Sequence, residues 1–366
     1  MKRVCLFNFP PIENFHGYHI ETFDPLAYFP RKDHWAFSDL IIWGLNGYDK
    51  RRAITAGASG VDRLYRERNP FYMRMISDFI DRFREFDFVI MGFYNFIHPE
   101  VLVRDLKKPI KILGFIDDPI STYTRGIPYL WAFDGAFYIS PGYIDDILFD
   151  DAIHKWCDKP AVWWPLVPYS FNRPKKIEDS FFRKRSVDIV YVGKPCESKV
   201  NRLIKLKRHF DVKFQVYGRW PFGGYSGLIR ALLGKPIYPH RVLPISDQDR
   251  TSLYWRTKIG FNMHVSDSPF ETGNMRMYEI PAHGMLMVCD KSSSSAHEIV
   301  FRPNIEAVYY DTLDEAIGLI EYYLHNEEER VCIAKNGFAR YWNDYEWERN
   351  LLNFLQWCET IRCSDM

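Results

Sequence analysis

The chain has 366 residues, of which 47% are hydrophobic and 17% aromatic, and its formal net charge is +1. This length and apolar content exclude a disordered chain and are sufficient for two domains with separate cores. No apolar run approaches the ~20 residues of a membrane span, and the first residues lead into a predicted strand rather than a signal peptide. The seven cysteines are scattered without a Cys-x-x-Cys pair, which disfavours disulfides and structural zinc and favours a cytoplasmic protein.

The first 168 residues alternate predicted strands with helical stretches, which is typical of a parallel sheet with covered faces. A stripe of Phe71, Met75, Phe79 and Phe83 predicts a core-facing helix over 70–86. We expect the segment 12–17, which follows Pro10-Pro11, to be a loop at the carboxyl edge of this sheet. Its Asn14 and His16 are therefore candidate acceptor contacts. The predicted strands of this half are 3–9, 39–43, 86–92, 109–116, 135–140 and 160–167.

A polar, proline-containing linker is predicted at 169–185, and a second αβ pattern covers 186–344. Thr312 and Glu315 have the spacing of a helix capping box. The last segment, 345–366, is a predicted helix with exposed-looking aromatic residues that need a surface to cover. The predicted strands of the second half are 186–193, 212–218, 258–264, 285–290 and 308–310.

The segment 271–290 contains a loop, a short predicted helix, a turn at Gly284 and a strand ending in Asp290. Asn274 supplies capping chemistry just before the helix. Arg276 and Glu279 are three residues apart, so they project from one side of it. An arginine can grip diphosphate oxygens, and a carboxylate one turn later can accept from ribose hydroxyls. The alternative is a surface helix with an ordinary Arg–Glu pair.

Other candidate donor-binding residues follow strands of the second half. Gly193 and Gly218 end predicted strands and allow close backbone approach. Lys194, Lys199 and Arg202 could neutralise a diphosphate leaving group, although surface lysines are more often simply solvated.

The charge is distributed unevenly along the chain. Between Arg173 and Asn262 there are 20 Lys and Arg residues against 7 Asp and Glu. Such asymmetry indicates contact with a polyanion, unless the basic segment lies against acidic partners within the fold. A predicted loop in this segment adds further candidate DNA or acceptor contacts, which are Arg219, Trp220, Phe222 and Tyr225.

A candidate general base lies in the first half. Asp117 directly follows the predicted strand 109–116, so its carboxylate is expected at the carboxyl edge of the sheet, and Asp118 is the alternate candidate. The same Asp-Asp-Pro sequence is also ordinary chemistry for a strand-to-turn junction.

These motifs resemble the GT-B glycosyltransferases, in which an Arg-x-x-Glu helix ends in a glycine turn and precedes a strand ending in Asp. Five segments, in the same order, are similar to the T-even phage DNA β-glucosyltransferases. They are Ile12–Phe15, Asp87–Phe96, Leu113–Asp117, Val187–Lys199 and Met275–Glu279. The C-terminal pattern also resembles the CgeB-type glycosyltransferases.

The resemblance implies an α/β GT-B fold with two Rossmann-like domains facing across a cleft and a C-terminal helix that returns to the first domain. It implies inverting transfer from a UDP-sugar, by default UDP-glucose, to 5-hydroxymethylpyrimidine in double-stranded phage DNA within the host cytoplasm. Asp117 would be the base, Arg276 the diphosphate ligand and Glu279 the ribose ligand of a monomeric enzyme. The resemblance implies no Asp-x-Asp metal-binding motif of the GT-A kind, so Mg²⁺ would assist the diphosphate without a protein cage.

Three alternatives remain open. The CgeB resemblance implies a cell-surface or spore glycan as acceptor. Glu271 and Glu279 also have the spacing of the retaining GT-B pattern. A non-catalytic protein that binds a nucleotide or nucleic acid is the third possibility.

Overall fold

The computed structural model forms two compact units, Met1–Pro165 with Leu351–Met366 and Leu166–Asn350. Each is considered by itself. The residues that the structure describes are 1–7, 12–28, 58–92, 96–115, 126–141, 151–165, 167, 173–174, 177–193, 197–218, 232–234, 238, 242–264, 274–291 and 296–364. No helix within these ranges is long and apolar enough to cross a membrane.

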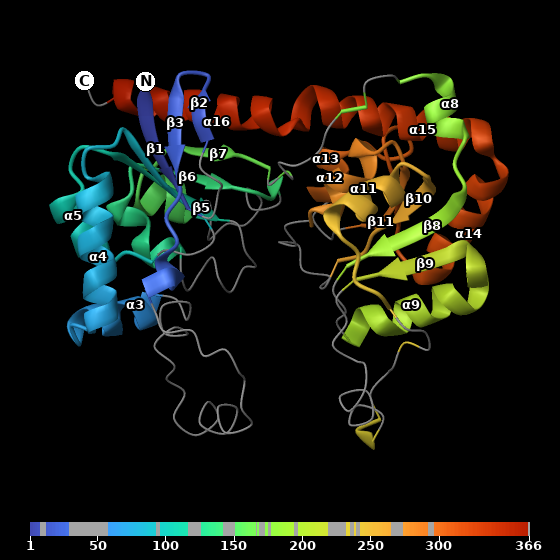
Figure 1. The fold of residues 1–366 in the computed structure, drawn as a ribbon, viewed down its shortest axis with the longest axis horizontal. Coiled ribbons are helices and arrows are strands. Elements are labelled where there is room, and N and C mark those ends of the chain that lie inside the picture. The colour runs from blue at the N-terminus through green and yellow to red at the C-terminus, as the bar shows by residue number, and fades with distance from the viewer. Residues whose placement is uncertain are drawn as a thin grey trace. The chain divides into compact units, whose positions relative to one another are not determined.

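The first unit is built on a seven-stranded sheet in the order β2-β3-β1-β4-β5-β6-β7 (Figure 1). All neighbouring strands are parallel except β2 and β3, which confirms the predicted α/β class with a parallel sheet. The strands are β1 (Lys2–Leu6), β2 (Ile12–Phe15), β3 (Tyr18–Glu21), β4 (Phe88–Met91), β5 (Ile110–Phe115), β6 (Gly135–Tyr138) and β7 (Ala161–Trp163). The helices are η1 (Pro25–Tyr28), α3 (Ala58–Arg66), α4 (Pro70–Phe83), α5 (Pro99–Asp105), η3 (Ile127–Ala132), η5 (Asp151–Trp156) and the C-terminal α16 (Trp347–Ser364). The predicted strand 39–43 lies outside the described residues.

Helix α4 supplies much of the core of this unit. Phe79 packs on Phe7, just beyond β1, with ring centroids 5.8 Å apart, and Met75, Phe79 and Phe83 are fully buried as predicted. Phe71 was expected to join this stripe but is 36% exposed. The reason is geometric: with 3.6 residues per turn, a spacing of four drifts around the axis, and over 12 residues the drift is about 120°.

The segment 12–17 is not the loop that we expected. Ile12–Phe15 forms β2, which turns through His16 and Gly17 into the antiparallel β3. Lys2 pairs with Tyr18 in parallel register, and its N–H donates to the Gly17 carbonyl at 3.0 Å. The turn therefore lies at the amino edge of the parallel strands, opposite the edge where ligands bind. Asn14 and His16 were predicted to contact the acceptor at the carboxyl edge, and this position is corrected. The reason is that the chain forms the hairpin of β2 and β3 directly after β1, where a loop was expected.

The end of α16 packs within the first unit. Phe354 stacks on Trp164 with ring centroids 4.0 Å apart and planes 1° apart, and its ring also contacts Phe137 edge-on. Glu359 accepts from the Tyr18 hydroxyl and pairs with Lys2 at 2.5 Å. Aromatic stacking and this partly exposed ion pair tie the C-terminal part of α16 to β6, β1 and β3.

The second unit is built on a five-stranded parallel sheet in the order β12-β11-β10-β8-β9 (Figure 1). The chain passes from β8 to β9 on one side and then to β10 on the other, so the strand order reverses between β8 and β10. The strands are β8 (Val187–Val192), β9 (Phe214–Tyr217), β10 (Thr257–Phe261), β11 (Leu286–Asp290) and β12 (Val308–Tyr310). The helices are α8 (Asp179–Arg183), α9 (Glu197–Phe210), η6 (Asp211–Lys213), α11 (Asp247–Tyr254), α12 (Arg276–Ala282), α13 (Ala296–Val300), α14 (Leu313–His325), α15 (Glu327–Arg340) and η7 (Tyr341–Tyr345).

The predicted linker 169–185 contains α8, which is part of the second unit. Phe182 is buried there, and Arg185 donates to the carbonyls of Tyr254 (3.1 Å), Thr257 (2.6 Å) and His283 (2.9 Å). These bonds satisfy carbonyls where α11 and α12 end. The glycine turn predicted at Gly284 has φ +70°, and a Cβ there would lie 2.9 Å from the Arg185 guanidinium.

Candidate nucleotide site

Arg276 spans the point at which the strand order of the second unit reverses. Its Nη1 donates to the Val192 carbonyl at the end of β8 (3.0 Å), and its Nη2 to the Met263 carbonyl beyond β10 (3.3 Å). Its Nε donates to Asn262 Oδ1 at 2.9 Å. Ligands of open α/β sheets bind in the crevice at this reversal, outside the carboxyl ends of the strands. The sequence placed Arg276 on the helix, and the structure adds the reason why its guanidinium reaches this crevice.

The guanidinium keeps donor capacity for a ligand. Of its five N–H groups, three are used by Asn262, Val192 and Met263, and the guanidinium forms no further hydrogen bond with a described residue. The side chain is half-buried and lies over the Tyr191 ring, with 5.0 Å between the guanidinium carbon and the ring centroid. A fixed, partly desolvated guanidinium is well suited to a bidentate contact with phosphate oxygens.

Gly193 makes room for this arrangement. A Cβ at this position would lie 2.4 Å from Arg276 Nη1 and 2.8 Å from the Tyr191 hydroxyl. Any side chain at 193 would therefore displace the guanidinium. The sequence predicted a close backbone approach at Gly193, and the neighbour that requires it among the described residues is Arg276. Gly218 ends β9 as predicted, and its N–H donates to the Leu243 carbonyl at 3.0 Å.

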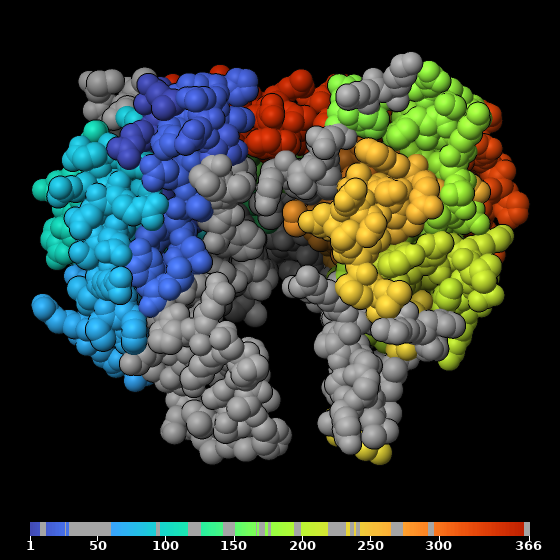
Figure 2. Space-filling view, viewed as in Figure 1, coloured from blue at the N-terminus to red at the C-terminus, as the bar shows by residue number. Residues whose placement is uncertain are grey.

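The Glu279 carboxylate contacts α11. Glu279 is 5% exposed, accepts from the Tyr254 hydroxyl at 3.3 Å and lies 3.6 Å from Arg250 Nη2. Burial raises the pKa of Glu279, although the charges of Arg250 and Arg276 oppose the shift. Arg250 comes from α11, which lies at the surface of this unit (Figure 2). The contacts of Arg250 and Tyr254 with Glu279 could not be predicted, because both residues come from a helix far from Glu279 in the chain.

Asn274 shapes the start of α12. Its Oδ1 accepts from the Arg276 backbone N–H at 3.0 Å, and its Nδ2 donates to the Met263 carbonyl at 3.4 Å. Capping before the helix was predicted for this residue, and both contacts hold the helix against the end of β10.

Lys199 is buried in α9, and Arg202 Nη1 lies 4.0 Å from Asp290 Oδ2.

Asp290 organises a second polar group, beyond the ends of β10 and β11. It accepts from the backbone N–H of His264 (2.8 Å) and lies 2.7 Å from His264 Nδ1. Burial alone would raise the pKa of Asp290, but the hydrogen bonds and charge of His264 outweigh it and hold the pKa at about 2. The sequence placed Asp290 at a strand end and missed His264 as its partner.

This polar group also contains metal-type donors. Ligand atoms of His264, Cys289, Asp290 and His297 lie within 4.8 Å of one another, and sulfur, imidazole and carboxylate are ligands that zinc accepts. Asn262 Nδ2 donates to Cys289 Sγ at 3.4 Å, and the Asp290 carbonyl lies 3.1 Å from His297 Nδ1. The direct His264–Asp290 bond joins two of the four groups without an ion.

Part of the positive charge between 173 and 262 is paired inside the second unit. Lys205 pairs with Asp314 (2.5 Å), which lies outside this segment, and Lys258 pairs with Asp188 (2.6 Å), which lies within it. Arg183 pairs with Glu328 at 2.5 Å. The alternative interpretation of the charge asymmetry, acidic partners within the fold, therefore accounts for part of it.

Seven predicted site residues lie outside the described residues. They are Asp117, Asp118, Lys194, Arg219, Trp220, Phe222 and Tyr225. Only the approach to Asp117 is described: β5 ends at Phe115, a buried residue, two positions before it.

The fold has many solved counterparts, whereas no curated protein matches the sequence. An α-glucosyltransferase of phage T4 in complex with UDP is 9% identical, with a TM-score of 0.58 over 98% of this chain and 100% of that one. Sucrose-phosphate synthase from Thermosynechococcus elongatus is 12% identical, with a TM-score of 0.56 over 83% of this chain and 80% of that one. The HepE protein of Anabaena in complex with UDP-glucose is 11% identical, with a TM-score of 0.53 over 78% and 82%.

Residues 199–356 match the family model described as glycosyl transferase-like. This range begins at Lys199 and includes α12 with Arg276 and Glu279. The two parallel-sheet units correspond to those of the GT-B structures above. The chain therefore has the predicted GT-B fold, and its segment 199–356 is similar to the glycosyl transferase-like family.

Proposed function

We propose that the protein is a glycosyltransferase that uses a UDP-sugar. The observation that carries the proposal is the Arg276 guanidinium, which is fixed between the ends of β8 and β10 and keeps two N–H groups for a ligand. A diphosphate placed there would meet a preorganised cation at the moment when negative charge develops on the leaving group. Structures of the same fold with bound UDP or UDP-glucose support this choice of donor.

The remaining donor contacts follow from this placement. Gly193 would allow the diphosphate to approach the end of β8, and Gly218 does the same at β9. Lys194, Lys199 and Arg202 would add positive charge at the start of α9. Glu279 would accept from the ribose hydroxyls, in the ionised form that the charge of Arg250 favours against burial. Asn274 would act through the position of α12, since its amide contacts the backbone on both sides.

The chemical step that we propose is inverting. The carboxylate of Asp117, or of Asp118, takes the proton of the acceptor hydroxyl as its oxygen attacks the anomeric carbon. The bond between that carbon and the β-phosphate oxygen breaks, and UDP leaves with the electron pair. Any Mg²⁺ would assist the diphosphate.

A retaining reaction is the second candidate, and one observation favours it. Structural counterparts of this fold include an α-glucosyltransferase and a TarM complex that contains α-GlcNAc-glycerol. Glu271 and Glu279 have the spacing of the retaining pattern, and Glu279 lies next to Arg276 in α12. NMR of the product separates the two candidates: inversion of the α-linked donor gives a β-linked sugar, and retention gives an α-linked one.

The acceptor that we propose is 5-hydroxymethylpyrimidine in double-stranded DNA. Support comes from the sequence resemblance and from α-glucosyltransferase structures of this fold with DNA, one of which contains an HMU base. A flipped base would bring its hydroxymethyl group to Asp117, with Arg219, Trp220, Phe222 and Tyr225 as DNA contacts. A glycan acceptor of the CgeB type is the second candidate, favoured by the internal pairing of Lys205 and Lys258.

The decisive experiment measures sugar transfer from radiolabelled UDP-glucose to duplexes with 5-hydroxymethylcytosine and to the same duplexes with cytosine. Transfer only to the modified duplex is expected, and Asp117→Asn should abolish it while UDP still binds. Arg276→Gln should weaken UDP binding, whereas the matched surface variant Lys205→Gln should not. If UDP-glucose is hydrolysed but neither duplex is modified, the acceptor is a glycan. If UDP does not bind to the wild-type chain, the whole proposal fails.

A further inference from the structure

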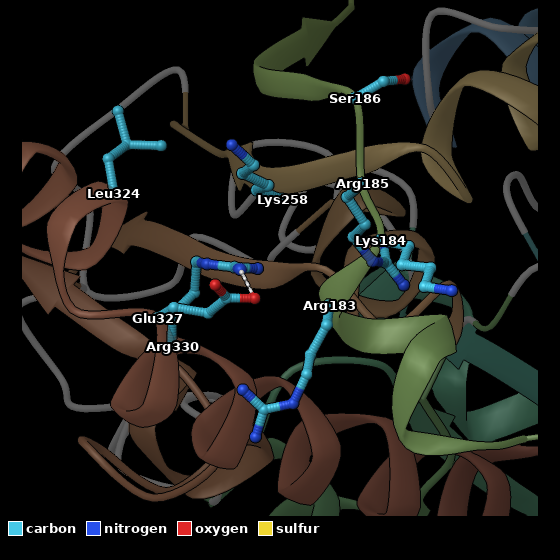
Figure 3. Close-up of a pocket in the computed structure, with 8 residues that line it drawn as sticks. All are labelled: Arg183, Lys184, Arg185, Ser186, Lys258, Leu324, Glu327 and Arg330. Atoms are coloured by element: carbon cyan, nitrogen blue, oxygen red, sulfur yellow. Dashed lines mark ion pairs between the residues drawn. The ribbon is translucent and has the colours of Figure 1, made fainter.

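A second cationic pocket lies at the opposite edge of the same sheet. It is an open pocket of about 410 Å³, bounded by the end of α8, the starts of β8 and β10, and α15 (Figure 3). Ser186 directly precedes β8, and Lys258 is the second residue of β10. Since β8 has six residues at about 3.3 Å each, roughly 20 Å of strand separates this pocket from Gly193 and Arg276.

The pocket wall is strongly basic. Its cationic residues are Arg183, Lys184, Arg185, Lys258 and Arg330, and its acidic residue is Glu327. Two of these charges are neutralised elsewhere: Arg183 by Asp179 and Glu328, and Lys258 by Asp188. Three cationic side chains therefore remain to be accounted for.

Arg185 and Arg330 carry buried charges with little compensation. Arg185 is 5% exposed, bonds only to backbone carbonyls, and has no carboxylate partner within the described ranges. Burial, and then the charge of Arg330, lowers the pKa of Arg185 to about 9. Arg330 is 2% exposed. Its Nη2 lies 3.5 Å from Glu327 Oε1, and a dashed line marks this ion pair in Figure 3. Burial also lowers the pKa of Arg330.

Arg330 also has an unused donor. Its Nε is buried and has no hydrogen-bond partner among the described residues. A buried donor without a partner destabilises the fold, and more so when the group is charged. Lys184, at the exposed end of the pocket, forms no ion pair with a described residue. The pocket thus contains the buried guanidinium groups of Arg185 and Arg330, which repel each other, and the ammonium group of Lys184. One N–H of Arg330 has no partner among the described residues.

We propose that this pocket binds a small phosphate-bearing anion, held by Arg330 and Lys184 at a site separate from the Arg276 site. An anion there would offset the repulsion between Arg330 and Arg185 and pair with the ammonium group of Lys184. The pocket volume is in the range of small-ligand sites, about 300–1,000 Å³, so a phosphorylated metabolite fits as well as free phosphate.

The test uses inorganic pyrophosphate as the probe, by calorimetry at constant ionic strength. The full chain carries Arg276→Gln, so that the result is independent of the proposed nucleotide site. We expect this chain to bind one equivalent of pyrophosphate. Adding Lys184→Ser should weaken binding about fivefold and adding Arg330→Gln about tenfold or more, whereas adding the matched control Lys205→Gln should not change it.

The controls make each outcome decisive. Arg330 is buried, so circular dichroism and the unfolding midpoint check that its variant is folded; Lys184 is exposed, and its variant tests the same site if Arg330→Gln unfolds. Absence of pyrophosphate binding in the Arg276→Gln chain would overturn the proposal. So would binding that neither Lys184→Ser nor Arg330→Gln weakens. Glucose 1-phosphate that binds more tightly than inorganic phosphate would identify a phosphorylated metabolite, and equal affinities would identify the free anion. Lys184-dependent binding of a DNA duplex without binding of pyrophosphate would also overturn the small-anion proposal.

Discussion

Replacing Gly193 by alanine tests the Arg276 site without removing any charge. The added Cβ would lie 2.4 Å from Arg276 Nη1, whereas ordinary contact distances are about 3.5 Å. The guanidinium must therefore move by about 1 Å, which breaks its 3.0 Å bond to the Val192 carbonyl. The Cβ would also lie 2.8 Å from the hydroxyl of the buried Tyr191, so the unfolding midpoint of the variant is measured beside its UDP affinity. A lost charge-assisted hydrogen bond to the diphosphate is worth about 1.5–3 kcal/mol, which predicts roughly 10- to 140-fold weaker UDP binding.

The assay is calorimetric titration of UDP into the wild-type chain, Gly193→Ala and a matched glycine control. Gly318 in α14 is suitable, because a Cβ there would meet nothing within 4 Å. Gly318→Ala should bind UDP as the wild type does and should be slightly more stable, since alanine favours a helix. Unchanged UDP affinity in Gly193→Ala, with an unchanged unfolding midpoint, would refute the placement of the diphosphate beside Arg276.

Three further predictions concern stability. Asp290→Asn should destabilise the second unit by about 2 kcal/mol at pH 7 in urea unfolding, because the pKa of Asp290, about 2, lies below the ordinary 3.8. A depressed folded-state pKa stabilises the fold only above the unfolded value, so the difference from wild type should shrink as the pH falls from about 4 toward 2. A difference that stays constant with pH would contradict the role of His264. Phe354→Ala should destabilise the first unit by about 3–5 kcal/mol through loss of its stack on Trp164, whereas the exposed Gln356→Ala should be neutral in the same denaturation experiment. Thr312→Ala should cost about 1 kcal/mol, because the Thr312 hydroxyl accepts from the Glu315 N–H at the start of α14; Thr312→Ser should restore most of it, and equal losses in both variants would exclude the cap.

Most β strands of both sheets could be recognised from the sequence, because buried parallel strands form short apolar runs. Strands β8, β9, β11 and β12 lie within their predicted ranges, and the cap at Thr312 was recognised by its spacing. The hairpin of β2 and β3 was missed, because Asn14, His16 and Gly17 all have positive φ. Polar residues and glycine that permit such a turn are equally typical of a loop.

Within the candidate site, local pattern identified Arg276, Glu279, Gly193 and Asp290, since each residue belongs to a strand end or to one short helix. Their partners Asn262, Arg250, Tyr254 and His264 come from segments up to 29 residues away in sequence and could not be paired by spacing. The ion pairs of Lys205 with Asp314 and of Lys258 with Asp188 could not be predicted from spacing either. The number of unpaired positive charges was therefore overestimated from the sequence.

The sequence alone determined the α/β class, the parallel sheets and the helix that carries Arg276, because these depend on local apolar periodicity and turn residues. Only the tertiary structure decided where the strand order of the second unit reverses, and hence that the guanidinium lies between β8 and β10. It also decided that Arg185 and Arg330 are buried together. Both are consequences of strands and helices distant in sequence packing side by side, which no local pattern encodes.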